Sequence, residues 1–149
     1  LTSHVKDGVA LCKEYKIPQD IIDIVEQHHG NSHASFFYAK AISLYGENNV
    51  NKDDYRYPGP KPLTKEAAII MIADSCEAAV RSLSNHGNNK IDNMVHKIIN
   101  QKLNDGQFDE CDISMKELMV VATVYIKILS SMFHSRIEYP ENIVETEAR

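Results

Sequence analysis

The chain has 149 residues, of which 43% are hydrophobic and 25% charged, a composition that suits one globular domain and excludes a disordered chain. Its formal net charge of −5 excludes a global field that attracts nucleic acid or an anionic membrane surface. Three widely spaced cysteines without a Cys-x-x-Cys pair argue against a disulfide framework and favour a reducing cytosol, and no apolar run is long enough to cross a bilayer.

The first predicted helix begins at a Thr2 or Ser3 cap and runs to about Tyr15. Its apolar spacing places His4 at the start of an inward-facing stripe, and Gly8, one turn later, leaves space beside the imidazole. A single inward histidine is more often a hydrogen-bonded core residue than a metal ligand, so His4 alone predicts no site.

The second predicted helix ends in a pair of histidines. Pro18 lies in its first turn, and Gly30 is placed to end it in a left-handed conformation. His28 and His29 continue the apolar stripe of this helix, and adjacent helical residues point about 100° apart. The pair can therefore serve two metal ions, or one metal ion and a substrate. Alternatively, it complements the negative end of the helix dipole.

A third helix is expected over Ser35–Tyr45, followed by a polar connection that ends at Leu63. Long connections in compact domains are often functional, and three prolines within five residues stiffen the second half of this one. Tyr57 precedes the prolines and is a candidate for stacking on a base, with an exposed tyrosine as the alternative. Lys61 lies near the start of the next helix, where a phosphate group is favoured, although solvated lysines are commoner.

The next helix, capped by Thr64 and covering Ala67–Leu83, is the most apolar segment and carries Asp74 in its middle. A buried ionised carboxylate is costly unless it is paired or binds a metal, so we expect the helix to offer Asp74 to a pocket. The alternatives are that Asp74 pairs with Arg81 or caps a neighbouring helix, and Glu77 can form an ordinary i,i+4 ion pair with Arg81. The opposite face of the helix is purely apolar, through Ile69, Ile72, Cys76, Val80 and Leu83.

Two further helices are predicted in the last third of the chain. The spacing of apolar residues marks an amphipathic helix from Ile91 to Leu103, which Asp105-Gly106 ends. Residues Ser114–Glu117 match a capping box, and the helix that follows to about Phe133 is apolar almost all round, so we expect it to be buried. No strand-like alternation persists anywhere, so the predicted class is all-α with about six helices.

Candidate metal ligands come from three of the predicted helices, namely His4, His28, His29 and Asp74. Imidazole and carboxylate together suit zinc, iron or manganese. The histidines on polar or loop positions, which we interpret as surface residues, are His33, His86 and His96. The chain has no His-Glu-x-x-His, Walker, Gly-x-Gly-x-x-Gly or Gly-x-Ser-x-Gly motif, which argues against zincins, P-loop enzymes, dinucleotide-binding folds and α/β-hydrolases.

Five motifs, in this order, cover nearly the whole chain: Ser3-His-Val-Lys-Asp-Gly8, Ile24-Val-Glu-Gln-His-His-Gly30, Tyr57-Pro-Gly-Pro-Lys-Pro62, Ala73-Asp-Ser-Cys-Glu-Ala-Ala-Val-Arg-Ser82 and Phe133-His-Ser-Arg-Ile-Glu-Tyr-Pro140. Together they resemble the cytoplasmic HD domain of the seven-transmembrane HD (PgpH-type) bacterial phosphodiesterases. The resemblance implies an all-helical HD-domain bundle that hydrolyses cyclic di-AMP to the linear dinucleotide pApA. It also implies a cytoplasmic location, with a membrane reached only through segments absent from this chain.

By this resemblance, His4, His28, His29 and Asp74 hold two divalent metal ions, iron or manganese. A metal-bridged hydroxide, held by Asp74 and His28, would attack the phosphodiester in line. Arg81, Lys61 and Tyr57 are the residues that we expect to contact the substrate. The expected partner is a cyclic dinucleotide rather than a nucleic acid polymer, and the oligomeric state stays open.

The chain departs from the family in one respect. The family's ligand set also has an earlier histidine and an adjacent His-Asp doublet, and no His-Asp dipeptide occurs here. We therefore expect the C-terminal portion of one HD domain, inactive alone, with metal-ligand helices in 1–84, C-terminal helices in 90–133 and a polar tail in 134–149. The alternatives are an HD phosphohydrolase for cyclic di-GMP or a guanosine alarmone, or an HD module that binds nucleotides without catalysis.

Overall fold

The computed structural model describes residues 3–83 and 87–133, except for the side chain of Asn88. These residues form six α-helices and no strand, which confirms the all-α prediction. The helices are α1 (Ser3–Glu14), α2 (Gln19–Gln27), α3 (Ser35–Tyr45), α4 (Lys65–Arg81), α5 (Asn88–Asn104) and α6 (Met115–Met132), and two short 3-10 turns, η1 (Glu47–Asn49) and η2 (Lys52–Tyr55), follow α3. The predicted polar tail, His86 and most of the turn before α5 lie outside the described residues.

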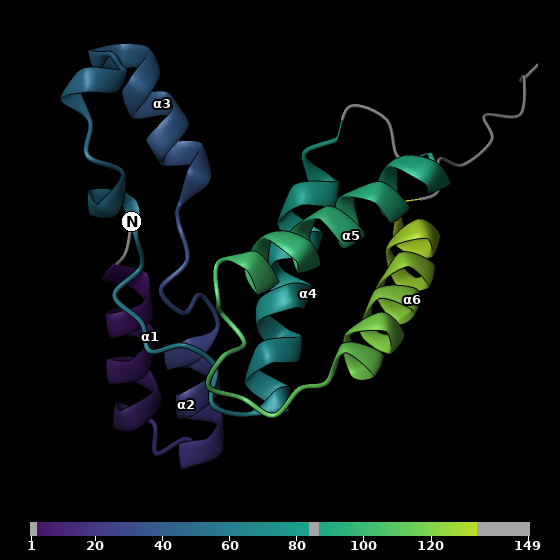
Figure 1. Cartoon of the computed structure of the whole chain (residues 1–149). Helices are drawn as coiled ribbons and strands as arrows, with labels where there is room; N and C mark the ends of the chain where they lie inside the picture. Colours follow the sequence, from purple (N-terminus) through teal and green to yellow (C-terminus); the bar gives the residue numbers. More distant parts are fainter. Residues whose placement is uncertain (1–2, 84–86, 134–149) are drawn as a thin grey trace, which may run out of the picture.

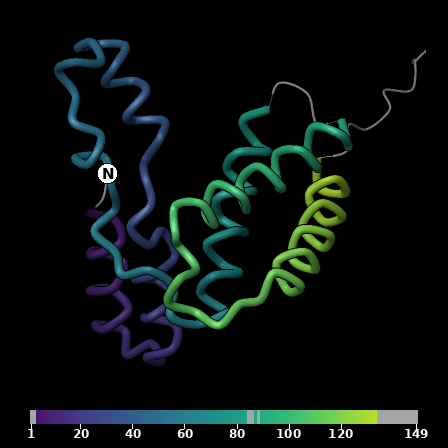
Figure 2. The backbone as a smooth tube through the Cα atoms, in the orientation of Figure 1, coloured from purple at the N-terminus to yellow at the C-terminus, as the bar shows by residue number. Residues whose placement is uncertain are grey.

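Helix α4 lies at the centre of the fold (Figure 1). It contacts α2 on one side and α5 and α6 on the other, while α1 packs on α2. Among the described helices and 3-10 turns, α3 contacts only η1 and η2, and the three form an arm that projects from the bundle. The chain then runs back from η2 past α1 and α2 to enter α4 (Figure 2). None of the described helices is sufficiently long and apolar to span a membrane.

The main core lies between α4, α5 and α6, and it orients α4. Ile72, Cys76 and Val80 on the predicted apolar face of α4 are fully buried. They pack in one cluster with residues such as Val95 of α5 and Leu118 of α6. Because this face of α4 is turned toward α5 and α6, other positions on the helix, Asp74 among them, are left to face the α2 side.

The predicted caps fix both ends of this core. The Thr64 hydroxyl accepts a hydrogen bond from the Ala67 amide at 3.2 Å. Ser114 and Glu117 form the predicted capping box at the start of α6, and Lys65 donates to Glu117 at 2.8 Å, which ties α4 to α6. Hydrogen bonds from Lys65 and then from Ser114 lower the pKa of Glu117 to about 2.

One prediction about α6 is wrong. The helix is not buried on all sides, and its exposed apolar side chains are Met115, Met119, Val120, Val124, Ile128 and Met132. The reason is tertiary, because α6 contacts only α4 and α5 and no other described element covers its outer face. An apolar face of this kind is typical of a contact with further protein.

Candidate metal centre

Three imidazoles meet where α1 packs on the end of α2. One ring nitrogen from each of His4, His28 and His29 lies within 4.8 Å of the other two. The Nε2 atoms of His4 and His29 are 3.0 Å apart. Two nitrogen ligands of one cation, each at about 2.1 Å and at a right angle, are about 3.0 Å apart, so this spacing fits a shared ion.

The close approach of α1 and α2 depends on a small residue. A Cβ atom on Gly8 would lie 3.2 Å from Cγ1 of Val25, which is tighter than most side-chain contacts. Val5 on α1 is buried, whereas Leu11 and Tyr15 are exposed. The predicted inward stripe of α1 is therefore wrong, and His4 is an exposed side chain that turns toward the histidine pair.

The tautomer of His28 is set by the backbone. Its Nδ1 lies 2.7 Å from the carbonyl oxygen of Val25. A carbonyl only accepts, so Nδ1 carries the proton, and Nε2 keeps a lone pair for a metal. The last residue of α2 is Gln27, so both histidines lie just after the helix rather than within it.

The turn that carries the histidines is held by packing and hydrogen bonds. Gly30 has a φ of +55°, as predicted, and a Cβ atom there would collide with Oε1 of Gln107. The buried Gln107 accepts from the Asn31 amide at 3.2 Å and donates to the Asn31 side chain at 2.7 Å. Ser32 donates to the carbonyl of His29 at 2.6 Å. These contacts position the pair before any ligand binds.

Asp74 lies beside the imidazoles but is not buried. Its Oδ2 is 3.7 Å from Nδ1 of His29, and its side chain is 48% exposed, against 17% for His29. The prediction that α4 buries this carboxylate is wrong, because the buried face of α4 lies on the opposite side of the helix from Asp74. The expected pocket is present, however, and Asp74 lines it together with His29. Its role as a metal ligand stays a prediction.

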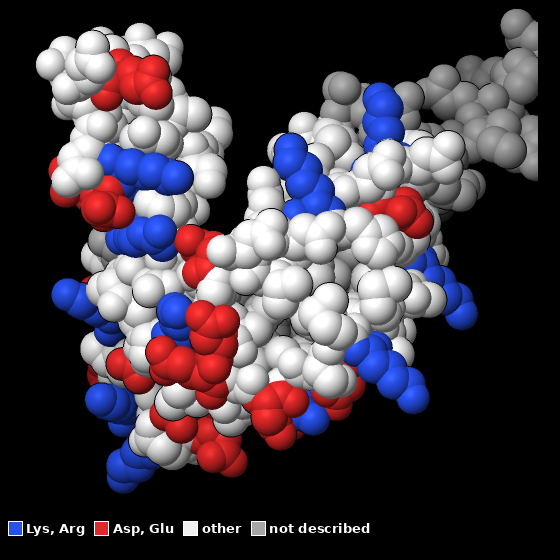
Figure 3. All heavy atoms as spheres, viewed as in Figure 1, with Lys and Arg blue, Asp and Glu red and all other residues white. Residues whose placement is uncertain are grey.

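The pocket is a hollow of about 200 Å³ between the arm, α4 and α5. Its lining residues are His29, Ser32, His33, Ala34, Ser35, Phe36, Phe37, Tyr57, Asp74, Ser75 and Lys102. Figure 3 shows this face hollowed between the arm and α5, with charges of both signs dispersed around it. A larger hollow of about 360 Å³, between α1 and the Pro58-Gly59 segment, contains none of the four predicted metal ligands.

Tyr57 is the one predicted substrate contact that lines this pocket. Its ring stacks on the His29 imidazole, with centroids 4.2 Å apart and the planes at 23°. Burial, and then Asp74, raise the pKa of Tyr57, so its phenol stays protonated at neutral pH.

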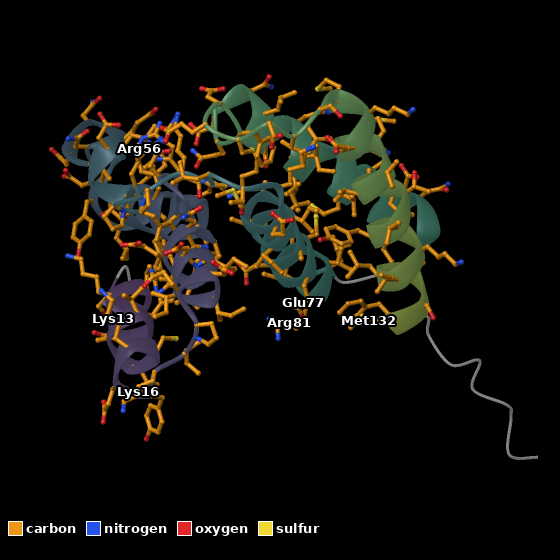
Figure 4. All side chains as sticks on the ribbon, turned by 90° about the horizontal axis from the view of Figure 1, so that it is seen from below. Lys13, Lys16, Arg56, Glu77, Arg81 and Met132 are labelled. Carbon is orange, nitrogen blue, oxygen red and sulfur yellow. The ribbon has the colours of Figure 1, made fainter. Side chains whose placement is uncertain are left out.

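The other two predicted contacts lie elsewhere. Arg81 pairs with Glu77 at 2.9 Å, the ordinary i,i+4 bridge that the sequence also allowed, and Figure 4 shows the two side by side near one end of α4. Lys61 lies 3.6 Å from Asp109. Neither residue lines the pocket, so their contacts with phosphate stay predictions that the structure does not support.

Two titratable residues of the pocket, His33 and Lys102, were not predicted. His33 was interpreted as a surface residue, yet it lines the pocket, and its Nδ1 is buried without a hydrogen-bond partner among the described residues. Burial lowers the pKa of His33 and of Lys102. Lys102 did have a signal in the sequence, because it follows Ile98 and Ile99 at the spacing of the buried stripe of α5.

His29 is neutral at physiological pH. Burial, followed by the neighbouring His28, lowers its pKa from 6.5 to about 4. A neutral imidazole offers its lone pair without first releasing a proton, which suits a metal ligand. Asp74 opposes the shift but does not reverse it.

This shift predicts a pH-dependent stability for the metal-free protein. Between pH 6.5 and about 4 the unfolded chain holds the proton on His29 that the folded chain lacks. The free energy of unfolding should therefore decrease as the pH is lowered through this range, and the contribution is complete above pH 6.5. Urea unfolding in the presence of a chelator measures it, and His29→Gln should flatten the dependence. An equally steep dependence in that variant would refute the assignment to His29.

The chain is similar in sequence to a known protein family and to individual members of it. The model of the family described as HD domain matches residues 1–79. The cyclic-di-AMP phosphodiesterase PgpH of Bacillus subtilis (strain 168) is 50% identical over 141 residues, and that of Listeria monocytogenes serotype 1/2a (strain 10403S) is 46% identical over 142 residues. Each match covers 95% of this chain and 20% of the relative, so the chain spans about a fifth of their length.

A solved structure agrees in fold. The crystal structure of the L. monocytogenes phosphodiesterase PgpH HD domain in complex with cyclic di-AMP matches with a TM-score of 0.83 and 46% identity. The match covers 93% of this chain and 64% of that one. A second crystal structure of the same HD domain matches with a TM-score of 0.80.

Proposed function

Because the chain belongs to the HD-domain family, we propose that it is part of a metal-dependent phosphodiesterase that hydrolyses cyclic di-AMP to pApA. The observation that carries the proposal is the cluster of His4, His28 and His29, with nitrogens within 4.8 Å, beside a pocket that also contains Asp74. The choice of substrate is supported by relatives that are named cyclic-di-AMP phosphodiesterases and by the solved domain in complex with cyclic di-AMP.

The donor set fits divalent transition metals. The three imidazoles would hold the first ion, and Asp74 would hold a second or complete the first. Iron or manganese, and a count of two ions, are the finer part of the proposal, since imidazole with carboxylate suits both metals. Divalent cations in such a site supply Lewis acidity toward phosphoryl oxygens and lower the pKa of water.

The protein's own side chains would orient the substrate. Asp74 lies at the boundary between the imidazoles and the pocket, so a phosphodiester in the pocket would face His29 beside this carboxylate. The volume of about 200 Å³ is below the range of about 300–1,000 Å³ of whole ligand sites, so the pocket suits one nucleotide's phosphate and sugar rather than the entire dinucleotide. Tyr57, Phe36 and Phe37 offer aromatic surfaces on which a base can stack.

A substrate panel tests the proposal. The intact HD domain, supplied with Mn²⁺ or Fe²⁺, should convert cyclic di-AMP to pApA, and should act at least about tenfold more slowly on cyclic di-GMP and a guanosine alarmone. Chromatography of the products gives the readout, and a chelator is the control. No hydrolysis, or faster hydrolysis of another nucleotide, would contradict it. The 149-residue chain alone should be inactive if the missing His-Asp doublet is required.

A further inference from the structure

Lys102, near the end of α5, differs from the other partly buried cations of the described residues in its contacts. The lysine and arginine side chains that the structure describes as not exposed are Arg56, Lys61, Lys65 and Lys102. The first three lie 2.8–3.6 Å from a carboxylate oxygen. Among the described residues, Lys102 has no carboxylate at ion-pair distance, and its ammonium group donates to the Ser32 hydroxyl at 3.0 Å.

A partly buried ammonium group without a carboxylate in ion-pair contact is costly, and the more distant Asp105 and Asp74 offset its burial only in part. Such a group in a pocket is a candidate for a functional role. Lys102 lines the same hollow as His29, Asp74 and Tyr57. An anionic ligand in that hollow would place a negative charge in direct contact with the ammonium group, next to the candidate metal ligands. The negatively charged groups of a cyclic dinucleotide are its phosphates.

We propose that Lys102 is a substrate-binding residue that contacts a phosphate group of the cyclic dinucleotide. This assignment rests on the proposed function, and it gives the pocket the cation that Lys61 and Arg81 do not supply. The charge reaches the pocket from α5, a helix that carries none of the four predicted metal ligands.

Ser32 fixes where the ammonium group points. Its hydroxyl accepts from Lys102 and donates to the backbone carbonyl of His29 at 2.6 Å. The ammonium has three N–H groups, so one is used in this bond and two remain for a ligand. The chain of bonds therefore ties the position of the cation to that of a candidate metal ligand.

The variant Lys102→Met keeps the length of the side chain and removes the charge. In the intact, metal-loaded domain, isothermal titration with a phosphorothioate analogue of cyclic di-AMP that resists hydrolysis should show an affinity about 10- to 100-fold weaker than wild type. The urea midpoint should be unchanged or higher, because an unpaired charge has been removed from the fold. Lys97→Met, an exposed lysine on the same helix, is the matched control and should bind as wild type does.

The variant Ser32→Ala tests whether ligand affinity depends on the charge of Lys102 or on its hydrogen bond with Ser32. It retains the ammonium group, so it should weaken the analogue far less than Lys102→Met does. Equal losses in both variants, or a Lys102→Met variant that loses stability together with affinity, would make Lys102 structural and overturn the proposal. Unchanged affinity in Lys102→Met would also overturn it, while hydrolysis by the wild type would leave the proposed function intact.

The role of Lys102 can be tested separately if cyclic di-AMP is not the substrate. If the wild type neither hydrolyses nor binds cyclic di-AMP, inorganic pyrophosphate is the probe of the pocket. Binding of pyrophosphate that depends on Lys102 would support an anion site there. Equal pyrophosphate affinity in the wild type and in Lys102→Met, or no pyrophosphate binding, would overturn the proposed role of Lys102.

Discussion

Replacing Asp74 with alanine is expected to reduce the hydrolysis of cyclic di-AMP by the intact domain at least about a thousandfold, since a ligand of the catalytic cations contributes several kcal/mol to the transition state. Asp74 is the carboxylate that the structure places between the imidazoles and the pocket. Initial rates at saturating Mn²⁺ measure the effect. A variant that turns over at the wild-type rate would remove Asp74 from the site.

The fold of this variant should survive. The Asp74 side chain is 48% exposed, and its closest ion-pair contact among the described residues is the 3.7 Å approach to His29. Exposed substitutions of this kind change the free energy of unfolding by about 0.5 kcal/mol or less. Glu77→Ala is the matched control, because Glu77 is a carboxylate on the same helix that pairs with Arg81 and does not line the pocket. It should retain the wild-type rate within about twofold.

Replacing His28 and His29 together with alanine is expected to weaken Mn²⁺ binding by about 100-fold or more, since even residues that only support metal ligands contribute 10- to 100-fold. The pair supplies two of the three clustered nitrogens. Because Nδ1 of His28 bonds to a backbone carbonyl, its Nε2 keeps a lone pair for the metal. Equilibrium dialysis with elemental analysis measures the bound metal.

The control for this variant is His96→Ala. His96 lies on α5, 3.8 Å from Asp92, and does not belong to the cluster. This variant should bind Mn²⁺ as wild type does. If the double variant retained its metal while His96→Ala lost it, the centre would have to be sought elsewhere in the chain.

The sequence predicted those parts of the fold that local chemistry determines. The caps at Thr64 and Ser114 and the left-handed Gly30 all depend on residues within one or two turns of one another, and all three are confirmed. The bounds of α3 were also predicted correctly. The second helix was predicted to include His28 and His29, whereas α2 ends at Gln27 and the pair lies in the turn that follows.

Properties that depend on packing between distant segments were predicted less well. The apolar pattern of α6 could not reveal that only one side of the helix meets α4 and α5. How far Asp74 is buried depends on which face of α4 packs into the core. The face that packs there is the one opposite Asp74. His33 enters the pocket because its segment pairs with Arg56, a contact that no helical periodicity encodes.

We propose that His4, His28, His29 and Asp74 bind divalent cations in common. Anomalous diffraction from crystals of the Mn²⁺-loaded domain, recorded at the manganese edge, tests it most directly. We expect at least one peak about 2.0–2.2 Å from an imidazole nitrogen of the cluster, with an oxygen of Asp74 also coordinated. A fully loaded protein whose manganese lies away from these side chains would contradict the account.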